Sequence, residues 1–286
     1  MRNMLFIPGN NPRMLTSGDY LGSDMLVIDL EDSVAPDQKD AARFLSRNAI
    51  QALNYTVPFC VRINSIETPY WKEDLRQLLP LGPSFIMIPK SDSAACIRTV
   101  SEEMTRLEKE FSIGTPVSIM ALIETAKGIE CAYEIACSDE RVFALYLGAE
   151  DLTADLHAKR TREGTEILYA RSRLISAARA AGKEAYDTPF TDVDDLDGLA
   201  QDALFAKQLG FDGKTAINPR HLHIINRAFT PTQAEIDYAK EVLQAEADGR
   251  RAGKGAVSLH NKMIDAPIVA RARYTLKIAG IAWKEA

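Results

Sequence analysis

The chain has 286 residues, with 34 lysines and arginines against 40 aspartates and glutamates, a formal net charge of −6 and 46% hydrophobic residues. This is ordinary globular composition, and the length allows one α/β barrel or two smaller domains. The acidic balance argues against a nucleic-acid partner, because binding a phosphate backbone needs a basic face. Apolar stretches fall far short of the roughly 18 residues typical of a membrane helix, and the N-terminal run Met4–Ile7 is too short for a secretory signal. We therefore expect a cytoplasmic protein with no membrane partner.

Short apolar runs recur along the chain, each followed by turn residues and a segment of helical periodicity. This alternation is typical of βα units around a parallel sheet. The predicted strands are Met4–Ile7, Met25–Leu30, Phe59–Ile63, Phe85–Ile88, Val117–Ile123, Val142–Leu147, Glu184–Thr188 and Lys214–Ile217. Eight such units, with no G-x-G-x-x-G motif, favour a (β/α)8 TIM barrel of the α/β class over a doubly wound sheet.

Helical periodicity fills several of the intervals between these strands. The clearest predicted helices are Gln38–Leu53, Cys96–Phe111, Gly128–Ala136, Glu166–Ala181 and Leu196–Leu209. A further start signal at Thr230–Pro231 predicts a helix to about Ala252. We therefore expect a catalytic barrel over residues 1–229 and a C-terminal helical extension over 230–286, acting as a lid or an arm for oligomer formation.

Polar residues at the carboxyl ends of the strands are the best candidates for a site, because barrel enzymes place their active sites there. Glu124 ends one strand and Asp151 follows the next, so their carboxylates should meet at one mouth and repel each other. Mg²⁺ would resolve that repulsion, since it takes one or two protein carboxylates and keeps water and substrate oxygens as further ligands. The alternative is that both residues are helix caps or salt-bridge partners.

Two cationic residues are expected at the same mouth. Arg62 directly follows Phe59–Val61, and an arginine fork can bind a carboxylate in bidentate fashion; alternatively it pairs with Glu31 or Asp32 for structural reasons. Lys90 is either an imine-forming nucleophile or a lysine facing solvent or a phosphate.

The segment Gly213–Thr215 looks like the end of a phosphate-binding loop, but Gln208 stands where the leading glycine should be, so we interpret it as a strand start.

The strand-end residues form motifs in an order that resembles the citrate lyase β-subunit family, which groups with the malyl-CoA and citramalyl-CoA lyases. The matching segments are Arg2–Asn10, Asp29–Val34, Val61–Asn64, Leu122–Thr125, Gly148–Asp151, Gly210–Arg220 and Lys262–Pro267. The resemblance implies a Mg²⁺-dependent barrel that cleaves a 3-hydroxy-acyl thioester into a 2-oxo acid and an acetyl thioester.

The resemblance also implies roles for individual residues. Glu124 and Asp151 align with the metal ligands, Arg62 with the carboxylate-binding arginine, and the pair Glu31 and Asp32 with the acidic residues behind the metal-bound waters. Asp265 aligns with a proton-transfer residue that reaches the site of a neighbouring subunit, which implies a homotrimer; alternatively, it is a helix N-cap. We expect further substrate contacts from the strand-end and loop residues Gly148, Ala149, Glu150, Lys90, Asn218, Asn10 and Arg13, the last two near the thioester handle.

The leading hypothesis is a citrate lyase β subunit that cleaves a citryl group on an acyl-carrier protein, alongside that carrier and a transferase subunit. One alternative is a free-standing lyase for citramalyl-CoA or malyl-CoA. A second is a non-catalytic subunit that only docks the carrier, and a third is an imine-forming aldolase that uses Lys90.

Overall fold

The computed structural model describes residues 1–251, 253, 257–260 and 262–283. Contacts divide the chain into two compact units, Met1–Arg227 and Ala228–Ala286, which are described separately. Among the described residues, no helix combines the length and apolar character needed to cross a membrane.

The first unit is built on a closed barrel of eight parallel strands in sequence order, β1 to β8. Closure is made by β1 and β8, where Leu5 is the register partner of Ala216. The strands are β1 (Asn3–Pro8), β2 (Leu26–Asp29), β3 (Phe59–Arg62), β4 (Phe85–Ile88), β5 (Ser118–Ile123), β6 (Val142–Leu147), β7 (Glu184–Asp187) and β8 (Gly213–Ala216). The predicted TIM barrel is therefore confirmed, and each predicted strand agrees with an observed one to within one residue at either end.

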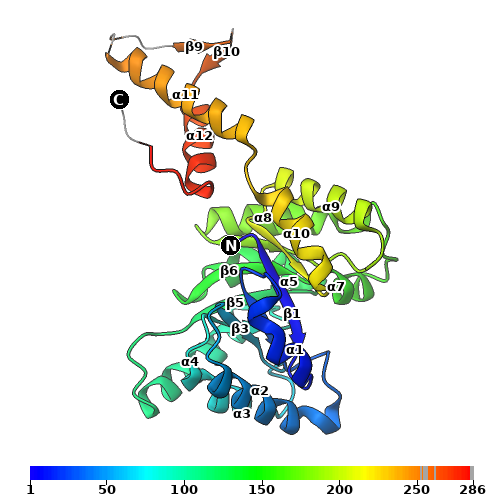
Figure 1. The fold of residues 1–286 in the computed structure, drawn as a ribbon. Helices are drawn as coiled ribbons and strands as arrows, with labels where there is room; N and C mark the ends of the chain where they lie inside the picture. Colours follow the sequence, from blue (N-terminus) through cyan, green and yellow to red (C-terminus); the bar gives the residue numbers. More distant parts are fainter. Residues whose placement is uncertain (252, 254–256, 261, 284–286) are drawn as a thin grey trace. The chain divides into compact units, whose positions relative to one another are not determined.

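Helices follow the strands around the barrel (Figure 1). They are α1 (Pro12–Ser17), α2 (Lys39–Leu53), α3 (Trp71–Leu78), α4 (Ala94–Glu110), α5 (Ala126–Glu130), α6 (Ala132–Ala136), α7 (Ala149–Asp155), α8 (Leu168–Ala180), α9 (Leu196–Leu209) and α10 (Leu222–Phe229). Several begin at a side chain that accepts a hydrogen bond from the first turn, as Ser93 does from the Cys96 N–H. The predicted helix Gly128–Ala136 is broken at Cys131 into α5 and α6.

Apolar side chains from strands β1 to β7 fill the barrel interior. Met4, Val27, Cys60, Met87 and Met120 are among the fully buried residues of this cluster. Such a filled interior is a packed core rather than a pore. Function is therefore expected at the mouth, where the strands end in polar residues.

The second unit is a helical hairpin with a small ribbon. It consists of α11 (Gln233–Arg251), the antiparallel strands β9 (Val257–Leu259) and β10 (Lys262–Ile264), and α12 (Ala266–Ile278). Its own core includes Val242, Leu243 and Leu276. Ala252, where we expected the helix to end, lies outside the described residues, and we did not predict the ribbon.

Candidate active site

Arg62 is fixed at the mouth by a carboxylate on the neighbouring strand. Asp29 ends β2 and is the register partner of Arg62 at the end of β3. Arg62 Nε lies 2.7 Å from Asp29 Oδ1 and Nη2 lies 2.7 Å from Asp29 Oδ2, a bidentate pair of nearly buried side chains. Burial alone would raise the pKa of Asp29, but the guanidinium holds it below its ordinary value. Asp29 therefore orients Arg62, a role for which we had considered only Glu31 and Asp32.

The same guanidinium also faces Glu31 and Asp32. Arg62 Nη1 lies 3.1 Å from Glu31 Oε2 and 3.4 Å from Asp32 Oδ2. Burial raises the pKa of Glu31 to about 7, against the pull of Arg62. The Arg62 guanidinium thus meets three carboxylates, those of Asp29, Glu31 and Asp32.

Glu124 lies beyond the end of β5 with its carboxylate almost completely buried. Its Oε1 accepts a hydrogen bond of 2.7 Å from the backbone N–H of Lys90. Lys90 has a φ of 50°, the left-handed region that non-glycine residues rarely adopt. Burial, reinforced by the charge of Glu31, raises the pKa of Glu124 to about 8. A compensating cation at this carboxylate would stabilise its charged form.

Asp151 reaches the mouth from the first turn of α7, and its side chain is 41% exposed. Lys90 Nζ lies 4.0 Å from Asp151 Oδ2 and 3.9 Å from Glu31 Oε1. Partial burial alone would lower the pKa of Lys90, but Glu31 and Asp151 outweigh it and raise that pKa. A more firmly protonated ammonium group is a poor imine-forming nucleophile, so the geometry disfavours the aldolase alternative.

A cavity of about 150 Å³ lies at this mouth. Its polar wall is formed by Asp32, Arg62, Glu124, Glu150, Asp151 and Thr188, together with the backbone of Gly148 and Ala149. The apolar wall is formed by Phe6, Leu122, Tyr146, Pro189 and Ile217. A small acid with a short carbon chain suits such mixed walls, with the charged end held beside Arg62.

The phenol of Tyr146 has a fixed role in this wall. Its oxygen lies 3.0 Å from Thr215 Oγ1, and the Thr215 hydroxyl donates to the carbonyl oxygen of Asp187. A hydroxyl has a single proton, so both contacts form together only when Tyr146 donates to Thr215. In that arrangement the Tyr146 oxygen is left to accept a hydrogen bond from a ligand.

Other predicted site residues have different surroundings. Asn10 donates to Gln38, and Asn218 accepts from the N–H of Arg220. Among the described residues that line the cavity, neither of these asparagines occurs, and Arg13 is also absent. Their predicted contacts with substrate stay predictions.

Asp265 is in the second unit, where its side chain accepts a hydrogen bond from the N–H of Ile268 and caps α12. Asp265 is thus a helix N-cap, the alternative role that we considered for it. Its predicted part in proton transfer stays a prediction.

The donor set fits Mg²⁺. Glu124 and Asp151 supply hard oxygen ligands beside a cavity, and the buried Glu124 carboxylate is stabilised in its charged form by a cation nearby. In the described part of the chain, no three His, Cys, Asp or Glu side chains form a metal-binding group. Two protein carboxylates completed by water and substrate oxygens are nevertheless the usual environment of Mg²⁺ at catalytic sites.

Comparison with known proteins agrees with this geometry. A model of the HpcH/HpaI aldolase/citrate lyase family matches residues 2–219. The chain belongs to this family. It is 40% identical over 282 residues to the citrate lyase subunit beta of Leuconostoc mesenteroides subsp. cremoris, covering 97% of this chain and 93% of that protein. The predicted resemblance is confirmed, and the chain is a carbon–carbon lyase.

Two further relatives extend the comparison. The mitochondrial citramalyl-CoA lyase of Mus musculus is 30% identical over 290 residues, covering 97% of this chain and 86% of that protein. The crystal structure of protein CitE from Mycobacterium tuberculosis in complex with magnesium, acetoacetate and coenzyme A has a TM-score of 0.79, at 31% identity and 98% coverage of each chain. Magnesium, the cofactor predicted from the sequence, is thus bound in a homologous structure.

Proposed function

We propose that the chain cleaves a citryl thioester into oxaloacetate and an acetyl thioester, as a citrate lyase β subunit does. The observation that carries this proposal is the pair Glu124 and Asp151 on the rim of a cavity that also exposes the Arg62 guanidinium. The 40% identity to a citrate lyase β subunit supports the choice of substrate.

The reaction breaks the bond between the hydroxyl-bearing carbon and the methylene carbon next to the thioester. The hydroxyl gives its proton to a basic group of the site, the electron pair of the broken bond moves to the thioester as an enolate, and protonation of that enolate yields the acetyl thioester. When bound by Glu124 and Asp151, Mg²⁺ supplies Lewis acidity to the hydroxyl and carboxylate oxygens of the substrate.

Arg62 binds the substrate carboxylate and offsets the negative charge that develops. Asp29 holds its fork in place for that contact. Glu31 can hold or release a proton near neutral pH, because its pKa is about 7. Asp265 of a neighbouring subunit protonates the enolate, which requires an oligomer, and a homotrimer is the proposed assembly.

In the cell, the proposed partners are an acyl-carrier protein that bears the citryl group and the transferase subunit of a citrate lyase complex. The proposed compartment is the cytoplasm. Gly148, Ala149, Glu150, Lys90, Asn218, Asn10 and Arg13 are retained as proposed substrate contacts. A carrier-docking subunit without activity is disfavoured, because Arg62, Glu124, Asp151 and Asp265 are all present.

A free-standing citramalyl-CoA lyase is the second candidate, favoured by the 30% identity to the mouse enzyme. The purified chain should be assayed with Mg²⁺ on citryl-CoA, citramalyl-CoA and malyl-CoA. Faster turnover of citryl-CoA is expected; negligible citryl turnover beside rapid citramalyl turnover would replace the first candidate by the second.

Glu124→Gln and Asp151→Asn test the metal pair. Each should abolish Mg²⁺ binding in calorimetry and lower kcat/KM by at least about 100-fold, the scale expected when a transition-state contact is lost. Glu102→Gln, an exposed residue on α4, is the matched control and should behave as the unaltered chain. Full activity in either site variant contradicts the proposal.

A further inference from the structure

Helix α7, which presents Glu150 and Asp151 to the cavity, cannot cap its own N-terminus. The N-cap residue is Gly148, at φ −101° and ψ 97°. A Cβ atom built there would lie 2.7 Å from Glu124 Oε2 and 2.8 Å from Leu122 Cδ1, so the serine, threonine, asparagine or aspartate that usually caps a helix does not fit. The closeness of Glu124 thus excludes a local cap.

Thr188, 39 residues further along the chain, supplies the missing acceptor. The first N–H of the helix, on Ala149, donates a hydrogen bond of 3.1 Å to Thr188 Oγ1. Thr188 follows the last residue of β7, and only 1% of it is exposed. It also lines the cavity. The Thr188 hydroxyl, just after β7, therefore holds the N-terminus of α7, the helix that follows β6.

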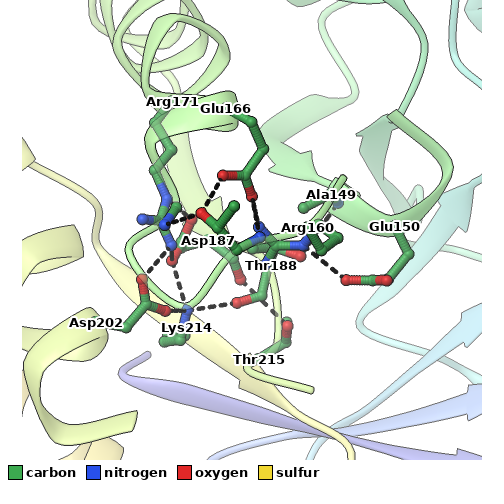
Figure 2. A network of polar contacts seen from close by, with 12 residues as sticks. Ala149, Glu150, Arg160, Glu166, Arg171, Asp187, Thr188, Asp202, Lys214 and Thr215 are labelled. Atoms are coloured by element: carbon green, nitrogen blue, oxygen red, sulfur yellow. Dashed lines mark hydrogen bonds and ion pairs between the residues drawn. The ribbon is translucent and has the colours of Figure 1, made fainter. Parts of the chain in front are cut away.

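The backbone of Thr188 is itself held by a buried lysine. Lys214 Nζ, in β8, donates 2.7 Å hydrogen bonds to the Thr188 carbonyl oxygen and to Asp187 Oδ2. Arg171 Nε and Nη2, in α8, bind both oxygens of Asp187 at 3.0 and 2.8 Å. Asp202, in α9, contacts both cations. Figure 2 shows these side chains converging on the Asp187–Thr188 segment.

This cluster contains two cations and two anions, so its formal charges cancel. Arg171, Asp187 and Lys214 have no exposed side-chain surface. Replacing such a buried ionic group by apolar residues is often neutral or stabilising. The position of the cluster explains it better, because side chains from α8, α9 and β8 together fix the backbone segment at the end of β7.

We propose that Thr188 is a positioning residue for Asp151, and that the cluster of Arg171, Asp187, Asp202 and Lys214 serves to hold it. The hydroxyl fixes the first turn of α7, and that turn aims the Asp151 carboxylate toward Glu124. This inference rests on the proposed role of Asp151 as a metal ligand, and it identifies the residues that hold that ligand in position.

Thr188→Val tests the inference, because it keeps the shape of the side chain and removes the hydroxyl. Residues that orient metal ligands typically change metal affinity by about 10- to 100-fold when altered. We expect Thr188→Val to weaken Mg²⁺ binding in the presence of pyruvate by at least about tenfold, measured by calorimetry on the full chain. Thr188→Ser, which retains the hydroxyl, should restore most of the affinity. In turnover assays Thr188→Val should raise the KM for Mg²⁺ far more than it lowers kcat at saturating Mg²⁺.

Thr153→Val is the matched control. Thr153 is a buried threonine of the same helix, and its hydroxyl donates to the carbonyl oxygen of Ala149. We expect unchanged Mg²⁺ affinity in this variant. If Thr188→Val does not fold, Thr188→Ala removes the same hydroxyl with less crowding and takes its place.

The outcomes separate this inference from the proposed function. If the unaltered chain binds Mg²⁺, Glu124→Gln abolishes that binding, and Thr188→Val binds as tightly as the unaltered chain, only the positioning role is overturned. If Thr188→Val and Thr188→Ser lose Mg²⁺ affinity equally, the positioning role is overturned as well. If the unaltered chain binds no Mg²⁺, both proposals are overturned.

Discussion

Arg62 is held in place by neighbouring carboxylates and still lines the cavity. Asp29 occupies Nε and Nη2 of its fork, while Nη1 faces Glu31 and Asp32 beside the cavity. The Phe6 ring packs 5.1 Å from the guanidinium carbon. An arginine held in this way loses little conformational freedom when it binds a carboxylate.

Arg62→Lys should lower kcat/KM by about 10²- to 10³-fold, because an ammonium group cannot engage Asp29 and a substrate carboxylate with the same planar fork. Steady-state kinetics on citryl-CoA would measure it. Arg106→Lys, on the exposed face of α4, is the control and should leave kinetics unaltered. Near-normal kinetics in Arg62→Lys would show that point charge alone suffices at this position.

Gly148 is a residue whose small size is required by its neighbours. Gly148→Ala should destabilise the barrel by about 1–3 kcal/mol, since the new methyl group overlaps the Glu124 side chain. For a unit of this size, that corresponds to a decrease in Tm of about 2–4 °C per kcal/mol. Gly114→Ala, where the structure shows open space around the added atom, is the control. Equal Tm values for the two variants would contradict the argument.

At the residue scale, sequence reasoning found the polar strand ends but not all of their partners. Asp187 lies near the end of a predicted strand, where residues of the mouth are expected, yet it is fully buried with Arg171 and Lys214. Residues far apart in sequence form this cluster, and periodicity carries no information about such pairing. Lys214 in particular resembled part of a phosphate loop and is in fact a strand residue, as its context predicted.

At the scale of elements, the sequence predicted the strands better than the helices. A buried strand such as Phe85–Ile88 is an uninterrupted apolar run, which marks both of its ends. Helix boundaries depend on local capping geometry, and the break at Cys131 between α5 and α6 has no comparable signal. The short ribbon of β9 and β10 was missed because three-residue strands are too brief for a period to show.

The ionic cluster that joins α8, α9, β7 and β8 makes a prediction about acid stability. Burial alone would raise the pKa of Asp202, but Lys214 and Arg171 hold it below its ordinary value. A carboxyl group with a lowered folded-state pKa stabilises the fold above its unfolded pKa, near 3.9, and that stability is lost as pH falls toward the folded value. Chemical denaturation should therefore show the free energy of unfolding falling steeply below about pH 4.

Asp202→Asn isolates this contribution. At pH 7 the variant should be less stable by about 3–5 kcal/mol, because the two buried cations, Arg171 and Lys214, keep only the Asp187 carboxylate between them. Below about pH 4 its free energy of unfolding should depend less on pH than that of the unaltered chain. The same pH dependence in both proteins would assign the acid sensitivity to other carboxylates, such as Asp29.

For the whole molecule, the proposed sharing of sites between subunits predicts complementation. Asp265→Asn and Glu124→Gln should each be inactive alone, because one lacks the proton-transfer group and the other a metal ligand. After the two are unfolded together and refolded as mixed oligomers, about one quarter of the sites should combine an intact barrel with an intact neighbouring Asp265. Activity near that fraction is expected in the mixture. An inactive mixture would place Asp265 in its own subunit's site, and activity of Asp265→Asn alone would place Asp265 outside the reaction.

The pairing of β1 with β8 affects how the chain can acquire its fold during synthesis. Met4 finds its partner Thr215 only after more than two hundred further residues have been made. At about 5–20 residues per second, the first strand waits roughly 10 to 40 s on the ribosome with an open edge. Early strands with unpaired backbone groups are prone to pair with other nascent chains. The yield of active enzyme should therefore depend on chaperones that shield the free edge of β1 until β8 has been synthesised.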